Sequence, residues 1–135
     1  MRGDGGTSST ALSVSGCDVC ELGCGHGLPG IACVSLFHAK RLMLQDYNED
    51  VLKRLTARNV ALNTGDATAA NVSYVVGEWS GMRAFLEARG DLHAFDLVLS
   101  AETAYQSSNI PSLVDAIHAV RTRKKCVPCL YASRL

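Results

Sequence analysis

A glycine-rich segment that follows an acid is the part of the sequence best suited to bind a ligand. It runs from Glu21 to Gly30 as Glu-Leu-Gly-Cys-Gly-His-Gly-Leu-Pro-Gly. A short apolar stretch precedes it, and Pro29 is suited to the first turn of a helix. Because glycine adopts positive φ readily, such a loop brings the backbone close to a ligand at a helix N-terminus. The pattern predicts a nucleotide-like cofactor at the carboxyl end of a parallel strand.

Two classes of cofactor are compatible with this loop. Gly25-x-Gly27-x-x-Gly30 matches the dinucleotide fingerprint, and Asp46 lies at about the spacing of a ribose-binding acid, which would make the chain a nicotinamide-dependent oxidoreductase. Glu21 argues against this, because its negative charge would oppose a pyrophosphate. S-adenosylmethionine has no phosphate and carries two cationic groups, an ammonium and a sulfonium. The charge beside the loop therefore favours S-adenosylmethionine.

Polar residues also stand at the ends of the next two predicted strands. Asp46 ends the second and can hold the two ribose hydroxyls, while Glu78 and Trp79 follow the third and can form an adenine pocket. A phosphate-free nucleoside ligand requires such groups at successive strand ends.

Strands and helices alternate along the chain, and the strands are almost continuously apolar. We expect strands at residues 16–22, 41–46, 72–77, 95–100 and 126–133. We expect helices at 29–38, 48–63, 81–89 and 109–125, with Asn48 as a helix cap and residues 66–71 as a loop. This order predicts an α/β fold: a doubly wound, Rossmann-like, mainly parallel sheet of about five strands.

The apolar spacing predicts which helix residues are buried. They are Ile31, Ala32, Val34 and Leu36 in the first helix, Val51, Leu52 and Leu55 in the second, and Ile110, Leu113, Val114, Ile117 and Val120 in the last.

Composition restricts the functional classes. The chain has 135 residues, 47% of them hydrophobic, and a formal net charge of +0. We expect a disordered leader at residues 1–15 and a single domain at 16–135, without a membrane span. Net charge gives no reason to expect nucleic-acid or membrane binding. Because the sequence shows no apolar run long enough for a membrane span and no signal-peptide h-region, the cytoplasm or nucleus is the expected location.

The cysteines include two Cys-x-x-Cys pairs, Cys17 with Cys20 and Cys126 with Cys129. Both pairs fall in predicted strands, where residues three apart point to opposite faces. We therefore expect buried thiols and no metal site.

Four motifs of the sequence together resemble those of a known family. The segment from Glu21 to Ile31 looks like motif I of the seven-strand (class I) methyltransferases. Three further blocks resemble the protein-histidine N-methyltransferases that modify a large-subunit ribosomal protein. These blocks are Gln45-Asp46-Tyr47-Asn48, Gly77-Glu78-Trp79-Ser80 and Ser100-Ala101-Glu102-Thr103-Ala104-Tyr105. The resemblance covers roughly residues 17–131.

The resemblance implies S-adenosylmethionine as cofactor, a protein as partner and a role for each motif. The cofactor-binding residues would be Glu21, Gly23, Cys24, Gly25, Gly27, Asp46, Tyr47, Asn48, Gly77, Glu78, Trp79 and Ser100. Glu102 and Tyr105 would face the acceptor, with Glu102 accepting the second N–H of a histidine imidazole. Each role has a structural alternative: Glu21 and Asp46 as helix caps, and Trp79 and Tyr105 as packing residues.

The family is expected to continue past the fifth strand into two further strands. Without them, residues 126–133 would form an apolar sheet edge, and we expect weak stability. Three functional interpretations remain open: a protein methyltransferase, a nicotinamide-dependent oxidoreductase, and a non-catalytic interaction domain that keeps the fold.

Overall fold

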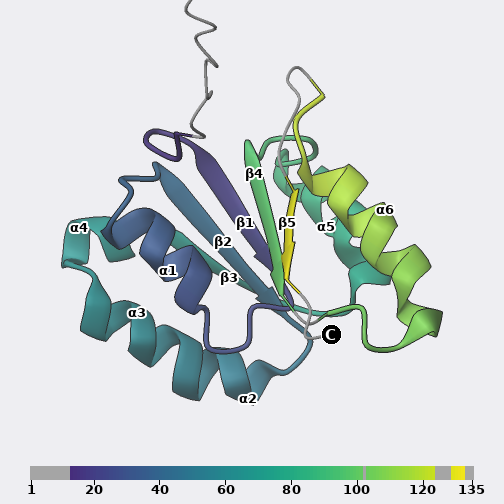
Figure 1. Ribbon diagram of the computed structural model, residues 1–135, viewed down its shortest axis with the longest axis horizontal. Coiled ribbons are helices and arrows are strands. Elements are labelled where there is room, and N and C mark those ends of the chain that lie inside the picture. Colours follow the sequence, from purple (N-terminus) through teal and green to yellow (C-terminus); the bar gives the residue numbers. More distant parts are fainter. Residues whose placement is uncertain (1–12, 102, 124–128, 133–135) are drawn as a thin grey trace, which may run out of the picture.

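Five parallel strands form the centre of the molecule (Figure 1). The computed structural model describes residues 13–101, 103–123 and 129–132. The strand order is β3-β2-β1-β4-β5. The strands are β1 (Asp18–Leu22), β2 (Arg41–Asp46), β3 (Val72–Val76), β4 (Leu97–Ala101) and β5 (Cys129–Ala132). Each predicted strand is confirmed within the described residues, and residues 126–128 and 133 of the predicted fifth strand lie outside them.

Helices cover both faces of the sheet, which confirms the doubly wound fold (Figure 1). One face carries α1 (Leu28–Ser35), α2 (Glu49–Val51), α3 (Ala57–Asn63) and α4 (Asp66–Ala69), and the other carries α5 (Met82–Arg89) and α6 (Ile110–Val120). Short 3₁₀ turns at Trp79–Gly81 and Ser107–Asn109 precede α5 and α6. No helix among the described residues is long and apolar enough to cross a bilayer.

The alternation of side chains along the strands produces two apolar cores, one on each face. Leu42 and Leu44 of β2 pack with Ile31 and Leu52 on the α1 and α3 side. Met43, between them, packs on the α5 and α6 side. Cys17 packs against the first core and Cys20 lies in the second, so this pair is divided between the two faces as predicted.

The predicted helix α1 was too long. The helix ends at Ser35, and Leu36 is 68% exposed because it lies past the last turn. Cys33, which was not predicted to be buried, packs into the core with Ile31 and Val34.

Two further element predictions were wrong. Residues 66–71 were expected to form a loop, but Asp66–Ala69 makes one helical turn that closes with a hydrogen bond from Ala70 N–H to Asp66 O. The last helix was expected to continue to residue 125. It ends at Val120, and Arg121 pairs with Phe95 in an isolated bridge. Residues 124 and 125 lie outside the described residues.

Helix α6 buries Leu113 and Val120 as expected, but two of its large apolar residues are exposed. Ile110 and Val114 are exposed, whereas Ala116 and Ala119 are buried with Leu113. Ala116 and Ala119 belong to the core cluster of this face, and the apolar spacing of the larger residues did not indicate this.

The segment between α2 and α3 contains five residues of π-helix, Leu52–Thr56. The wider turn places Thr56 in the interior, fully buried, and leaves Leu55 exposed, contrary to the prediction. Short π segments inside helices occur frequently at functional sites. Thr56 is directed at the glycine loop, where its hydroxyl donates to the carbonyl oxygen of Gly25.

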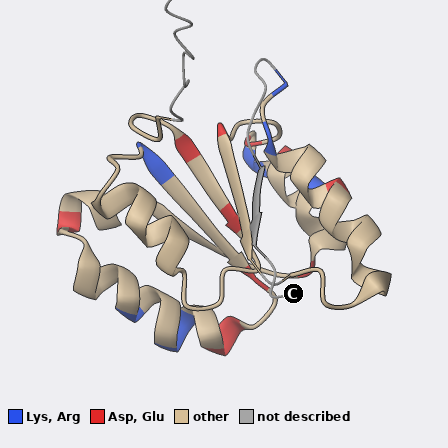
Figure 2. Ribbon diagram, in the orientation of Figure 1, with Lys and Arg blue, Asp and Glu red and all other residues tan. Residues whose placement is uncertain are grey.

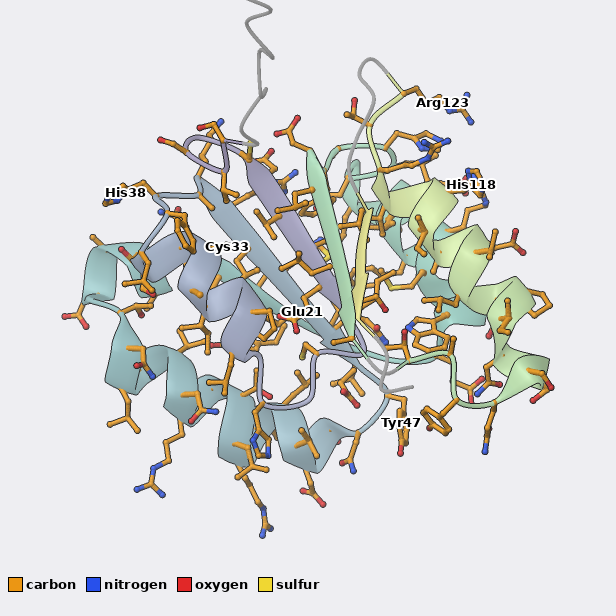
Figure 3. All side chains as sticks on the ribbon, viewed as in Figure 1. Glu21, Cys33, His38, Tyr47, His118 and Arg123 are labelled. Atoms are coloured by element: carbon orange, nitrogen blue, oxygen red, sulfur yellow. The ribbon has the colours of Figure 1, made fainter. Side chains whose placement is uncertain are left out.

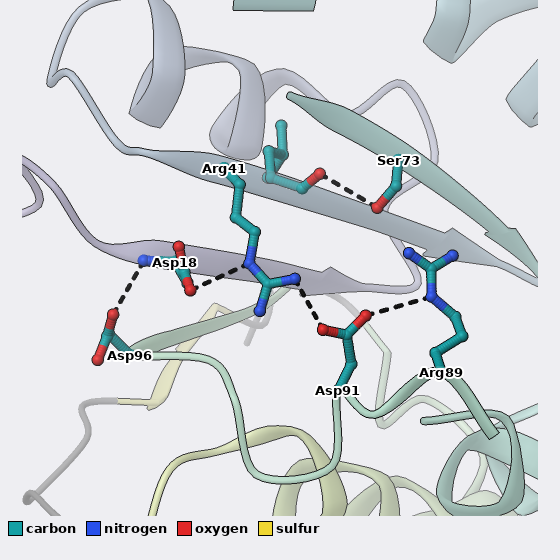
Figure 4. Close-up of polar contacts among 7 residues, drawn as sticks. Asp18, Arg41, Ser73, Arg89, Asp91 and Asp96 are labelled. Carbon is teal, nitrogen blue, oxygen red and sulfur yellow. Dashed lines mark hydrogen bonds and ion pairs between the residues drawn. The ribbon is translucent and has the colours of Figure 1, made fainter. Parts of the chain in front are cut away.

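Ion pairs join the strands at their N-terminal ends, where Figure 2 shows the base at the start of β2 beside the acid at the start of β1. Arg41 contacts Asp18 at 3.0 Å and Asp91 at 2.8 Å (Figure 4). Its guanidinium also lies 4.4 Å from the ring centroid of Phe95. This network fixes the N-terminal end of the sheet. A cavity lies at the other end, where the strands finish.

Candidate functional site

A cavity of about 580 Å³ lies at the carboxyl ends of the strands. This size is within the usual range for small-molecule sites, and the place agrees with the rule for open α/β sheets. Its lining residues come from the segments after β1, β2, β3 and β4 and from the start of α6. They are Gly23, Gln45, Asp46, Tyr47, Gly77, Glu78, Trp79, Ser80, Ala101, Thr103, Tyr105, Gln106, Asn109 and Ser112.

The glycine loop turns sharply between β1 and α1. Gly23, Gly25 and Gly27 have φ of +62°, +51° and +75°. These left-handed conformations cost a residue with a side chain about 1–2 kcal/mol. Gly27 is also the residue that precedes α1, and a β-carbon there would lie 2.9 Å from Cγ2 of Thr56.

Four backbone N–H groups of this loop are bonded within the protein. Gly23 donates to Oε1 of Gln45 at 3.0 Å, and Gly25 donates to Oδ2 of Asp46 at 2.9 Å. Cys24 donates to the carbonyl oxygen of Gln45, and Gly27 to that of Cys24, both at 2.8 Å. The loop conformation is therefore fixed by the end of β2.

Thr56 of the π segment holds the same loop from the other side. Its hydroxyl lies 2.6 Å from the carbonyl oxygen of Gly25 and donates to it. Asn59 of α3 donates to the carbonyl oxygen of His26 at 3.0 Å. The π turn thus directs a polar side chain at the loop where regular helix periodicity predicted Leu55 to be buried.

Glu21 contacts the first helix and is absent from the cavity lining. Its carboxylate accepts the N–H of Gly30, in the first turn of α1, at 2.8 Å, and its side chain lies in the interior (Figure 3). Burial raises the pKa of Glu21 to about 7, although the Gly30 hydrogen bond favours the ionised form. This geometry corresponds to the helix-capping alternative. Any effect of the Glu21 charge on a ligand would pass through α1, because Glu21 does not line the cavity.

We predict that Glu21→Gln flattens the pH dependence of stability. Between about pH 4.5 and pH 7 the unfolded chain releases the Glu21 proton while the folded chain keeps it. The free energy of unfolding should therefore fall as pH rises through this window, by about 3 kcal/mol in full. Glutamine stays neutral and keeps an oxygen for Gly30 N–H. In urea unfolding the variant should match wild type near pH 5 and exceed it near pH 8.

The matched control is Glu78→Gln, because Glu78 is an exposed acid. That variant should follow the wild-type pH profile. Parallel profiles for wild type and Glu21→Gln would contradict the assignment of the titration to Glu21.

Asp46 is buried and lines the cavity. Its Oδ2 accepts from Gly25 N–H and its Oδ1 from Asn48 N–H, each at 2.9 Å. A carboxylate has about four lone-pair positions, so capacity remains for the hydroxyls of a ligand. Asn48 is the predicted cap, and its side chain accepts from Asp50 N–H and Val51 N–H.

Tyr47 and Trp79 provide aromatic surface at the cavity. Tyr47 is 69% exposed and projects from the end of the fold where the strands finish (Figure 3). Trp79 is half-buried, packs against the α5 and α6 core, and donates its indole N–H to Oε1 of Gln45 at 2.9 Å. Trp79 therefore has both of the roles weighed for it, as a core residue and as a cavity wall.

The segment after β4 contacts the glycine loop. Thr103 is buried, and its hydroxyl lies 2.5 Å from that of Ser100. Ser100 in turn donates to the carbonyl oxygen of Leu22 at 3.5 Å. A β-carbon at Gly23 would lie 2.6 Å from Cγ2 of Thr103, so only glycine fits there without movement.

Of the two residues predicted to face the acceptor, the structure describes one. Glu102 lies outside the described residues. Tyr105 is 71% exposed and lines the cavity beside Gln106 and Asn109.

Seven predicted site residues line the cavity: Gly23, Asp46, Tyr47, Gly77, Glu78, Trp79 and Tyr105. Six other predicted site residues do not line the cavity. Cys24, Gly25 and Gly27 belong to the glycine loop, and the rest are Glu21, Asn48 and Ser100. Cys24 is buried in the core, and burial raises the pKa of its thiol. Sequence reasoning missed Gln45 and Thr103 as site residues, although both stand inside motifs that it had singled out.

Comparison with known proteins finds similarity to methyltransferases. Residues 4–135 match the family model described as lysine methyltransferase. The chain is 36% identical to "Histidine protein methyltransferase 1 homolog" of Dictyostelium discoideum over 116 residues, which are 85% of this chain and 35% of that protein. It is 28% identical to "Histidine protein methyltransferase 1" of Schizosaccharomyces pombe over 141 residues, 79% of this chain and 41% of that protein.

A solved structure shares the fold. The S-adenosylmethionine-dependent methyltransferase from Mesorhizobium loti aligns with a TM-score of 0.61 and 18% identity, over 82% of this chain and 44% of that one. The chain therefore has the fold of class I methyltransferases, and it spans about two fifths or less of the length of both curated relatives.

Proposed function

Because the chain belongs to the lysine methyltransferase family, we propose that it binds S-adenosylmethionine and serves methyl transfer to a protein histidine. The names of the curated relatives support histidine as the acceptor, whereas the family description names lysine. The resemblance of the motifs extends the proposal to a large-subunit ribosomal protein as substrate. The cytoplasm or the nucleus is then the proposed place of action.

The observation that carries the choice of cofactor is the use of the loop N–H groups. A dinucleotide places its pyrophosphate against free N–H groups of the glycine loop and the following helix. Here the carboxylate of Asp46 accepts from Gly25, the amide of Gln45 accepts from Gly23, and the carboxylate of Glu21 accepts from Gly30. Protein oxygens thus occupy positions that phosphate oxygens would need, and two of them belong to acids. This supports a phosphate-free ligand and disfavours a nicotinamide cofactor.

The cavity provides groups for each part of the proposed cofactor. Asp46 would accept the ribose hydroxyls, and Tyr47 and Trp79 would provide aromatic surface for the adenine. Once bound, S-adenosylmethionine supplies a methyl group already activated by the sulfonium. The protein then has to align donor and acceptor for in-line displacement. Tyr105, Gln106 and Asn109 line the side of the cavity after β4 and would contact the acceptor.

The nature of the acceptor predicts a pH profile. An imidazole with a pKa near 6.5 is mostly neutral at pH 7 and needs no strong base, whereas a lysine amine with a pKa near 10.4 must lose a proton first. We expect transfer from labelled S-adenosylmethionine to purified large ribosomal subunits to level off above about pH 7.5. Acid hydrolysis of the product should release methylhistidine.

Release of methyllysine, with a rate that keeps rising to pH 9, would replace histidine by lysine and leave the cofactor proposal intact. Absence of transfer together with absence of S-adenosylmethionine binding would support the non-catalytic alternative.

A further inference from the structure

One buried amide connects three separate parts of the cavity wall. Gln45 lies on β2, is 1% exposed and lines the cavity. Its Oε1 accepts from the N–H of Gly23 at 3.0 Å and from the indole N–H of Trp79 at 2.9 Å. Its Nε2 donates to the carbonyl oxygen of Gly77 at 2.6 Å. The ends of β1, β2 and β3 are thereby joined through a single side chain.

The partners determine the orientation of this amide. Two N–H donors face its oxygen and one carbonyl faces its nitrogen, so the opposite orientation would oppose like groups at all three contacts. A buried network of this kind rigidifies its surroundings when each member is satisfied. All three partners line the cavity, and such rigidity would hold Gly23 and Trp79 at a fixed spacing.

Gly23 and Trp79 are also in close contact with each other. A β-carbon at Gly23 would lie 3.4 Å from Cζ2 of Trp79, so the indole packs directly on the glycine loop. If the Gln45 bond to Trp79 is lost, the indole is free to turn away from this position, and the wall between the loop and β3 opens.

We propose that Gln45 is a positioning residue for the cofactor, which holds Trp79 against the glycine loop and so shapes the cavity before the ligand binds. The inference rests on the proposed function, because it assigns a role within the S-adenosylmethionine site. Gln45 acts through Gly23 and Trp79, and preorganisation of this kind improves affinity without a new ligand contact.

The chain contains its own optical reporter, since Trp79 is the only tryptophan. In ligand-free Gln45→Met, an apolar side chain of similar length removes all three hydrogen bonds. We expect its tryptophan emission to shift to the red and acrylamide to quench it more strongly than in wild type. The calorimetric Kd for S-adenosylhomocysteine should rise about tenfold or more.

Gln45→Glu provides a conservative rescue. The glutamate keeps an oxygen for Gly23 and Trp79, but as a carboxylate it places a second oxygen against the Gly77 carbonyl. Protonated, it regains a donor for that carbonyl. The loss of affinity relative to wild type should therefore shrink as pH falls from 8 to 5.5, an effect that a purely steric role would not produce.

Leu86→Ala separates positioning from general destabilisation. Leu86 is fully buried in the α5 core and is not part of the cavity lining. This variant should lower the melting temperature, as large-to-small core changes do, and leave the Kd within about twofold of wild type.

The outcomes are distinguishable. Suppose that wild type binds S-adenosylhomocysteine and that Gln45→Met shows the same Kd and the same tryptophan emission. This result overturns the role of Gln45 and leaves the proposed function intact. An equal rise in Kd for Leu86→Ala and Gln45→Met also overturns it, since destabilisation would then explain both. A wild-type chain that binds no S-adenosylhomocysteine overturns the proposed function, and the cofactor role of Gln45 with it.

Discussion

Replacement of Asp46 by alanine is expected to weaken S-adenosylhomocysteine binding by at least about 100-fold. The carboxylate holds Gly25 N–H and Asn48 N–H at 2.9 Å each, lines the cavity, and is the group that we propose accepts the ribose hydroxyls. Hydrogen bonds to charged groups are worth about 1.5–3 kcal/mol each, so loss of the ligand contacts and of the loop support should add. Isothermal titration of the folded variant measures the effect.

Two variants make the Asp46 result specific. Asp50→Ala removes an exposed acid from the adjacent turn, where its ion pair with Arg54 is long at 3.7 Å, and should bind as wild type does. Asp46→Asn keeps one acceptor oxygen and should lie between wild type and alanine. Equal binding by wild type and Asp46→Ala would remove Asp46 from the cofactor site.

The largest loss of stability is expected for Gly23→Ala. The new β-carbon would lie 2.6 Å from Cγ2 of Thr103 at a position whose φ is +62°. The left-handed conformation costs about 1–2 kcal/mol and overpacking a further 1–3 kcal/mol. Thermal unfolding should show a fall in melting temperature of about 10 °C or more.

The same loop offers a control for conformational strain. Gly25 has φ of +51°, and a β-carbon there would meet nothing within 4 Å, so Gly25→Ala should show only the smaller conformational cost. Adding Thr103→Ser to Gly23→Ala removes the opposing methyl group and should restore part of the stability. Equal effects of the two glycine variants, or no rescue by Thr103→Ser, would contradict the clash with Thr103.

Much of the fold could be predicted because short runs of residues determine where its strands and helices begin and end. Apolar runs such as Leu42–Leu44, each followed by a helix signal, permit few arrangements other than a parallel sheet covered on both faces. The cap at Asn48 and the left-handed glycines of the loop were likewise predictable from residue type. These features depend on a few neighbouring residues and hardly on tertiary context.

The errors arose where tertiary packing decides. Regular helix periodicity placed Leu55 in the core, but the π turn brings in Thr56, whose hydroxyl holds Gly25. Ile110 and Val114 were expected inside, but the buried side of α6 includes the alanines at 116 and 119. Apolar spacing cannot detect either effect, because both depend on what the helix meets.

The predicted motifs surround the cavity, but the contacts that their side chains make could not be predicted from residue type. Glu21 was assigned to the cofactor because of its charge, yet its carboxylate caps α1. Gln45 was treated as part of a strand, yet its amide joins Gly23, Gly77 and Trp79. A buried glutamine within an apolar strand is the signal that could have identified it, since a buried amide requires partners.

The central claim is that the cavity accepts a phosphate-free nucleoside cofactor in preference to a dinucleotide. Calorimetric titration of the 135-residue chain with S-adenosylhomocysteine and, separately, with NADH tests it most directly. We predict one-to-one binding of S-adenosylhomocysteine and no detectable heat of binding for NADH. Binding of NADH that S-adenosylhomocysteine fails to displace, or no binding of either ligand, would contradict the claim.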